Sequence, residues 1–156
     1  MRLLLPTLLA IAALFASAGT AAAGCGDNPG DAEAVAAARA QVEADCDCAG
    51  VASHGAYVSC AASVANARAN AEPSLLPRYC KGAVKRCAAR STCGKPGFVT
   101  CCRTGASGKT RCSTKRDAAL CVAPSGGSAC TGAFSSCCDA CTDGGCATPP
   151  TTSTLP

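Results

Sequence analysis

Cysteine constrains the fold of this chain more than any other residue type, because 16 of the 156 residues are cysteine. All of them lie at or beyond Cys25, and an even number of thiols can close as bridges with none left over. That density is typical of small proteins that fold in an oxidising compartment. We therefore expect disulfides at all of these positions: Cys25, Cys46, Cys48, Cys60, Cys80, Cys87, Cys93, Cys101, Cys102, Cys112, Cys121, Cys130, Cys137, Cys138, Cys141 and Cys146.

The first residues, 1–23, have the pattern of an export signal. Arg2 gives a positive start, residues 3–15 are almost entirely apolar, and small residues follow up to Ala23. The apolar run is shorter than the roughly 20 residues that span a bilayer, so we expect no transmembrane segment. Cleavage is predicted after Ala23, with Ala18 as the second choice, and the mature protein is predicted to be periplasmic or extracellular.

The residues before Cys25 are also similar to a lipobox, in which the cysteine would be acylated. Acylation of Cys25 would leave an odd number of thiols, whereas secretion without a lipid lets every cysteine pair. We therefore expect a secreted protein rather than a lipoprotein.

Large apolar side chains are too few to build an ordinary hydrophobic core. From Gly24 onward the chain has eight Val, four Leu, two Phe and two Tyr, and no Ile, Met or Trp. At about 1.5–3 kcal/mol for each fully buried side chain, these residues cannot offset an ordering cost of about 1–2 kcal/mol for every residue. Disulfides, at about 2–4 kcal/mol each, are expected to supply the missing stability.

The N-terminal half, residues 24–90, is predicted to be a helical subdomain with about three helices. The first is expected over Asp31–Asp45 with Asp31 as its N-cap, because turn residues precede it and alanine fills it. The second is expected over Gly55–Asn70, where apolar residues recur at helical spacing. The third is expected over about Arg78–Ala89.

The composition changes near Ser91, and residues 91–146 are predicted to form a second subdomain that is stapled by disulfides. Residues 105–108, which are rich in glycine and lie between β-forming segments, predict a hairpin. Residues 147–156 are rich in Thr and Pro, carry no charge and predict a disordered tail. The expected fold class is a small disulfide-rich α+β protein, with helices first and a β-hairpin and loops after them.

A weak internal repeat supports a boundary near Ser91. Residues 97–102 and 133–138 each place a phenylalanine ahead of two adjacent cysteines. Coincidence within a biased composition is the alternative explanation.

Charge is segregated along the chain, because residues 68–116 carry twelve basic side chains against one acid while residues 24–48 are acidic. Five of the bases lie between Cys102 and Cys121 and form a candidate binding loop: Arg103, Lys109, Arg111, Lys115 and Arg116. Such a loop can contact an anionic surface or an acidic protein. A solvated basic face with no partner would have the same sequence, so both interpretations stay open.

The cysteine order of the last 70 residues or so resembles that of inhibitor cystine knots. Residues 121–146 fit that order better than residues 87–121, and both sets would need Cys121. The resemblance implies a rigid scaffold that presents loops, with Lys115 or Arg116 as the primary residue for a trypsin-like protease. A protease inhibitor or toxin-like effector is therefore an alternative function, although spacing alone leaves fifteen pairings for six cysteines.

Metal binding is a further alternative, because Cys46, Cys48, His54 and Cys60 could supply thiolate and imidazole ligands. Known zinc frameworks usually pair Cys-x-x-Cys or His-x-x-x-His units, and this chain lacks that arrangement. With a single histidine and no nucleophile-elbow or metalloprotease motif, the sequence does not favour catalysis. We therefore expect no metal site, no cofactor and no enzymatic activity.

Four segments together resemble a set of uncharacterised exported cysteine-rich bacterial proteins: 46–48, 54–60, 80–82 and 85–98. The resemblance spans about residues 46–146 and implies export and a two-part layout, but it carries no known activity. We expect a monomeric, exported, non-enzymatic binding or structural module whose basic region contacts an acidic or anionic partner.

Overall fold

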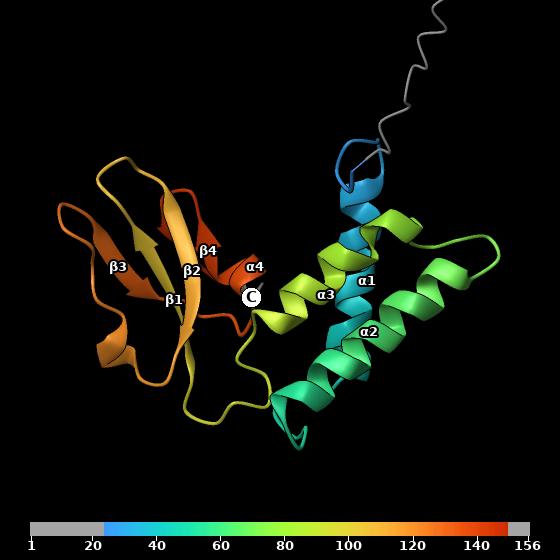
Figure 1. Ribbon diagram of the computed structural model, residues 1–156, viewed down its shortest axis with the longest axis horizontal. Coiled ribbons are helices and arrows are strands. Elements are labelled where there is room, and N and C mark those ends of the chain that lie inside the picture. The colour runs from blue at the N-terminus through green and yellow to red at the C-terminus, as the bar shows by residue number, and fades with distance from the viewer. Residues whose placement is uncertain (1–23, 150–156) are drawn as a thin grey trace, which may run out of the picture.

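The computed structural model describes residues 24–149, so the predicted signal peptide and residues 150–156 lie outside the described part. Helices come first in the sequence and antiparallel strands follow them, and the two groups lie on opposite sides of the molecule (Figure 1). The helices are α1 (Asp31–Asp45), α2 (His54–Asn70), the 3-10 helix η1 (Arg78–Cys80) and α3 (Lys81–Ala89). The later elements are β1 (Val99–Thr104), β2 (Thr110–Lys115), the 3-10 helix η2 (Ala118–Leu120), β3 (Ser128–Thr131), α4 (Cys137–Ala140), β4 (Cys141–Thr142) and β5 (Gly145–Cys146). The predicted disulfide-rich α+β fold is confirmed.

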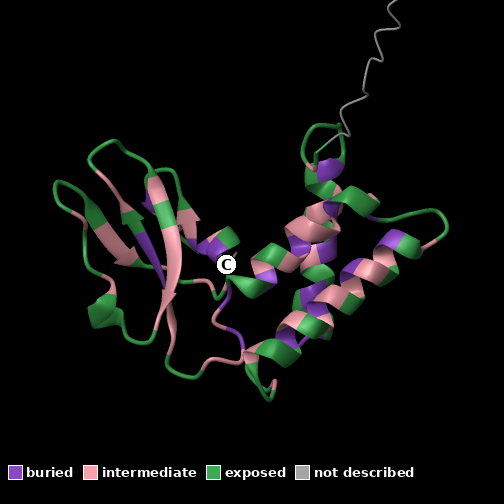
Figure 2. Cartoon of the chain, viewed as in Figure 1, coloured by how far each residue is buried: buried purple, intermediate pink, exposed green. Residues whose placement is uncertain are grey.

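The three predicted helices form where the sequence places them, with the third one divided into η1 and α3. Small side chains let them pack closely, and the fully buried residues of this part are mostly alanine and cysteine, with Leu76 and Val84 as the largest aliphatic side chains. Figure 2 shows the buried residues gathered where the helices meet and along β1. No helix in the described part is both long enough and apolar enough to cross a membrane.

The N-cap prediction for Asp31 is wrong. Gly30, whose φ of 88° favours glycine, is the N-cap of α1, and Asp31 is the first helical residue. The Asp31 carboxylate is buried and accepts hydrogen bonds from the backbone N–H groups of Gly26 and Asn28, at 3.0 and 3.3 Å. The side chain therefore closes the loop that precedes the helix.

The predicted hairpin is present, and its strands are longer than the segments that predicted it. Strands β1 and β2 pair antiparallel from Val99–Lys115 to Thr104–Thr110, around a turn in which Gly108 has a φ of 78°. A third strand, β3, was not predicted and pairs with the other edge of β1, which gives the order β2-β1-β3. The hairpin therefore supplies two strands of a small three-stranded sheet.

Three cysteines from the three strands stand in one row across the sheet. Cys102 on β1 lies directly opposite Cys112 on β2 and Cys130 on β3. Since directly paired residues point to the same face of a sheet, the three side chains share one face. Their partners follow in the same order along the C-terminal segment, as Cys112–Cys137, Cys102–Cys141 and Cys130–Cys146. Residues 137–146 therefore cross this face and are bound to every strand.

All sixteen cysteines are paired, as predicted. The other five bridges are Cys25–Cys80, Cys46–Cys60, Cys48–Cys93, Cys87–Cys138 and Cys101–Cys121. The pairing is not that of a cystine knot, because Cys130–Cys146 is the single bridge within residues 121–146 and Cys101–Cys121 the single bridge within 87–121. The remaining cysteines of both sets bond to partners outside their own set.

The two segments that suggested a repeat adopt different structures. Residues 99–102 of the first segment belong to β1, whereas Cys137 and Cys138 of the second begin α4. The similarity is therefore one of composition and not of structure.

The segment between α3 and β1 is fixed to both parts of the molecule. Ser91 and Cys93 are buried, and the Thr92 N–H donates to the Ser135 carbonyl at 2.8 Å. Cys48–Cys93 ties this segment to the helical part.

The ordered structure extends one residue into the predicted tail. Ala147, assigned to that tail, donates its N–H to the Ala140 carbonyl at 2.9 Å.

Candidate functional site

The β-hairpin gathers basic side chains on the sheet face opposite the row of bridged cysteines. Arg103 on β1 and Arg111 on β2 are directly paired, so their side chains leave the same face. Alternation along β2 places Lys115 on that face too, because it lies four residues after Arg111. Lys109, just before β2, lines one depression together with both arginines. We call these four residues, Arg103, Lys109, Arg111 and Lys115, the basic face.

The basic face has no acidic counterpart in the described part of the chain. The single ion pair between residues 24 and 149 joins Arg39 to Asp139, and none of the four basic-face side chains donates an intramolecular hydrogen bond there. Elsewhere, cations do find partners: Arg90 donates to the Cys112 carbonyl at 2.9 Å and Lys95 to the Ser91 carbonyl at 3.1 Å. The hairpin cations are thus left to solvent or to an external anion.

Three of the five predicted site residues line one depression of about 290 Å³ at the tip of the hairpin. Its wall consists of Arg103, Gly105, Ser107, Lys109, Arg111 and Pro124. Lys115 lies at the far end of β2, opposite Val99, and Arg116 is exposed just beyond that strand. The structure therefore brings Arg103, Lys109 and Arg111 together and leaves Lys115 and Arg116 outside the depression.

Covalent and steric constraints hold the wall of the depression in place. Cys101 on β1 is bridged to Cys121, which fixes the start of the loop that contains Pro124. At Gly127 an added Cβ would lie 2.9 Å from Pro124 and closer still to the Thr104 carbonyl oxygen, so this loop lies tightly against the end of β1. Sequence reasoning missed Pro124 and Ser107, because nothing local indicates that residues 121–127 return to the hairpin tip.

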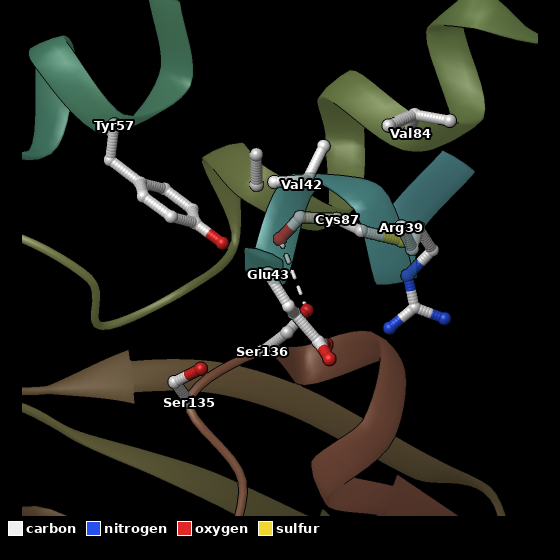
Figure 3. Close-up of a pocket in the computed structure, with 9 residues that line it drawn as sticks. Arg39, Val42, Glu43, Tyr57, Val84, Cys87, Ser135 and Ser136 are labelled. Atoms are coloured by element: carbon white, nitrogen blue, oxygen red, sulfur yellow. Dashed lines mark hydrogen bonds between the residues drawn. The ribbon is translucent and has the colours of Figure 1, made fainter. Parts of the chain in front are cut away.

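A second hollow lies between the helices and the loop before α4, and it is too small for a ligand. Figure 3 shows Tyr57, Glu43 and Arg39 of the helices around it, facing Ser135 and Ser136. The hydroxyl of Ser136 donates to the Cys87 carbonyl at 3.1 Å, so part of this wall is already engaged. The volume of about 20 Å³ has room for roughly one water molecule.

The residues that were proposed as metal ligands are engaged in other bonds. Cys46 is bridged to Cys60, and Cys48 to Cys93. The ring nitrogens of His54 face the carbonyl oxygens of Cys93 and Ala89, at 2.9 and 3.1 Å. His54 therefore links the start of α2 to the end of α3, and the metal alternative has no free ligand set at these residues.

The bridge from Cys25 to Cys80 bears on the lipoprotein alternative. A lipidated cysteine carries its acylglyceryl group on the sulfur, and in the structure this sulfur is bonded to Cys80. The bridge thus supports the unlipidated form.

A polar cluster around the buried Asp31 carboxylate was not predicted. The Tyr79 hydroxyl donates to Asp31 Oδ1 at 2.9 Å and accepts from Asn28 Nδ2 at 2.8 Å. The pKa of Asp31 is lowered, chiefly by the Gly26 N–H donor, although burial acts in the opposite direction. The pKa of Tyr79 is raised, chiefly because its proton is donated to Asp31. The cluster anchors the N-terminal loop on η1, beside Cys25–Cys80.

Comparison with known proteins does not assign this chain to a family. No protein-family model matches the chain, and neither a curated protein nor a solved structure shows significant similarity to it. The function must be argued from the site.

Proposed function

We propose that this protein is an exported, non-enzymatic binding module whose basic face engages an anionic polymer or surface. The observation that supports it most is the direct opposition of Arg103 and Arg111, neither of which forms an ion pair with an acidic side chain among the described residues. Like charges directly opposite on a sheet destabilise it by a few tenths of a kcal/mol up to about 1 kcal/mol. An external anion would remove that repulsion on binding.

Rigidity adds to this argument. The strand that carries Arg103 also carries Cys101 and Cys102, bonded to Cys121 and Cys141. A preformed array of charges loses little conformational entropy when it binds, which favours affinity without a large interface. Export is supported by the eight bridges, because cytosolic thiols are kept reduced.

The protease-inhibitor alternative has less support. Lys115 is paired with Val99 within the sheet and is half-buried, so its side chain does not stand on a protruding loop. Arg116 is exposed, but it directly precedes Asp117, whose carboxylate accepts from the Ala119 N–H at 2.8 Å and caps η2. These contacts leave a short segment for a protease to engage in extended form.

Binding to dextran sulfate, with uncharged dextran as the reference, tests the proposal. We expect the affinity to fall steeply as NaCl rises from 50 to 300 mM, because the Debye length shortens over this range and the exposed charges are screened. Neutralising three basic-face residues (Arg103→Gln, Arg111→Gln, Lys115→Gln) should weaken binding at least about tenfold, roughly 1.4 kcal/mol.

The matched control removes the same charge from the helical part (Arg78→Gln, Lys81→Gln, Arg86→Gln), where the side chains belong to η1 and α3. This control should keep most of the affinity. Equal losses in the two triple variants would show that net charge alone governs binding and would remove the basic face from the proposal.

A further inference from the structure

The depression at the hairpin tip allows a more specific assignment than general attraction to anions. We propose that Arg103, Lys109 and Arg111 form a discrete site for one tetrahedral oxyanion group, a phosphate or sulfate ester carried by a larger molecule. This inference rests on the proposed function and names the chemical group that the basic face recognises.

The number and kind of donors favour a tetrahedral group over a carboxylate. Two guanidinium groups and one ammonium group line the same wall, and all three residues are exposed. Each guanidinium presents a planar fork of N–H donors, which matches two oxygens of a phosphate or sulfate. A tetrahedral ester offers three terminal oxygens for three cations, whereas a carboxylate offers only two.

The register places the two arginines side by side instead of spreading them along the strand. Arg103 and Arg111 are a direct cross-strand pair, so their Cβ atoms lie within about 4.5–5.5 Å of each other. Lys109 and Ser107 follow on the same wall, and the exposed Ser107 hydroxyl makes no intramolecular hydrogen bond in the described part. A single bound group can therefore contact both arginines and have further donors within reach.

The open rim indicates that the anion can be part of a larger molecule. An added Cβ at Gly105 or Gly108 would meet nothing within 4 Å, so the tip of the hairpin is bare. Opposite it, Pro124 supplies an apolar surface against which the carbon skeleton of an ester can pack. The site thus has a charged end that can hold the oxyanion and an open side through which the rest of the ligand can extend.

NMR titration of the arginine Nε–Hε signals tests the site directly. The probes are phenyl phosphate and phenyl sulfate, with benzoate as the carboxylate control and NaCl used to hold ionic strength constant. We expect saturable shifts of the Arg103 and Arg111 signals with one or both esters and only weak, unsaturated shifts with benzoate. Tighter binding of phenyl phosphate would identify the dianion as the preferred group, and tighter binding of phenyl sulfate would identify the sulfate ester.

Variants distinguish binding at a specific oxyanion site from general attraction to the positive charge of the basic face. Arg103→Gln should weaken ester binding at least tenfold, whereas Lys115→Gln, on the same face but outside the depression, should change it less than twofold. Arg103→Lys keeps the charge without the fork and should lie between them. Intact mass showing eight bridges, together with a wild-type far-UV circular dichroism spectrum, checks that each variant is folded.

The failures of the two proposals are distinguishable. Equal effects of Arg103→Gln and Lys115→Gln on ester binding, or shifts at Arg103 and Arg111 no larger than at Arg116, would overturn the oxyanion site. The basic face would survive that result if dextran sulfate still bound with the expected charge dependence. Ester binding without any polymer binding would leave the site in place and overturn the polymer partner.

Discussion

Cys87 on α3 and Cys138 in α4 form the single bridge, among the eight, that joins an element of the helical part directly to an element of the sheet part. Their Cα atoms are 5.5 Å apart, and Asp139, which forms an ion pair with Arg39, directly follows Cys138 in sequence. Near this bridge, the backbone hydrogen bond from the Thr92 N–H to the Ser135 carbonyl also joins the two parts. The covalent and noncovalent links therefore act in parallel.

Replacing this pair (Cys87→Ser with Cys138→Ser) should lower the free energy of unfolding by about 2–4 kcal/mol and leave the far-UV circular dichroism native. The reason is that the unfolded chain gains conformational freedom while the backbone bonds between the parts remain. Because Cys102–Cys141 stays closed, the loop released is short: 15 residues from Cys87 to Cys102 and 3 from Cys138 to Cys141. Chemical denaturation at fixed redox conditions measures the change. The matched double variant at Cys46 and Cys60, with a separation of 14, releases a loop of similar length and should cost nearly as much if loop entropy governs the loss. Costs that differ by more than about 1 kcal/mol would contradict the entropic explanation.

The helices were predictable because their signals are local. Alanine content, the turn before Asp31 and the spacing of apolar residues fix where α1 and α2 begin and end. The role of Asp31 was not predictable, because one of its partners, Tyr79, lies 48 residues further along the chain. A residue favoured at the N-cap is thus used one position later, where the nearby Gly26 and Asn28 N–H groups and the distant Tyr79 hydroxyl donate to it.

The sheet and the site depend on pairings that leave no local signal. Strand β3 has only four residues, and its register with β1 places Cys130 opposite Cys102. The basic loop was recognised from the sequence, but only the register shows that Arg103 faces Arg111 while Lys115 is distant from both. Disulfide connectivity was equally hidden, because spacing alone leaves many pairings open.

Reduction should abolish the fold. Most of the buried residues are alanine and cysteine, so a reduced chain retains few large apolar contacts to offset the entropy of ordering. We expect an excess of a phosphine reductant to remove the cooperative thermal transition and most of the helical circular dichroism signal. An alkylated, reduced sample that melts cooperatively near the original temperature would show that packing alone holds the fold.

Gly94→Ala should destabilise the contact between the start of α2 and the segment after α3. Gly94 has a φ of 68°, and an added Cβ would lie 2.5 Å from the His54 backbone nitrogen, with the Ser53 carbonyl carbon closer still. Gly108→Ala is the matched control, because its φ is 78° but a Cβ there meets nothing within 4 Å. Both variants carry the left-handed strain of about 1–2 kcal/mol, and Gly94→Ala should cost about 1–3 kcal/mol more from overpacking. Equal denaturation midpoints for the two variants would mean that the backbone moves away without cost.

The Asp31 cluster should make stability depend on acid pH. The folded pKa of Asp31 is lowered, chiefly by the Gly26 N–H donor, so its contribution is complete above the unfolded value of about 3.9. That contribution is lost as the pH falls below this value and through the lowered folded pKa, because the protonated carboxyl accepts these hydrogen bonds less strongly. Asp31→Asn keeps the shape but removes the charge.

Thermal melts of the wild type and Asp31→Asn between pH 2 and pH 7 measure this effect. The wild type should be more stable at pH 7, and the two curves should converge toward pH 2. Asp143→Asn, at an exposed residue between β4 and β5, is the control and should follow the wild type. A stability difference between wild type and Asp31→Asn that stays constant across the range would show that the side-chain shape, and not the carboxylate charge, holds the N-terminal loop on η1.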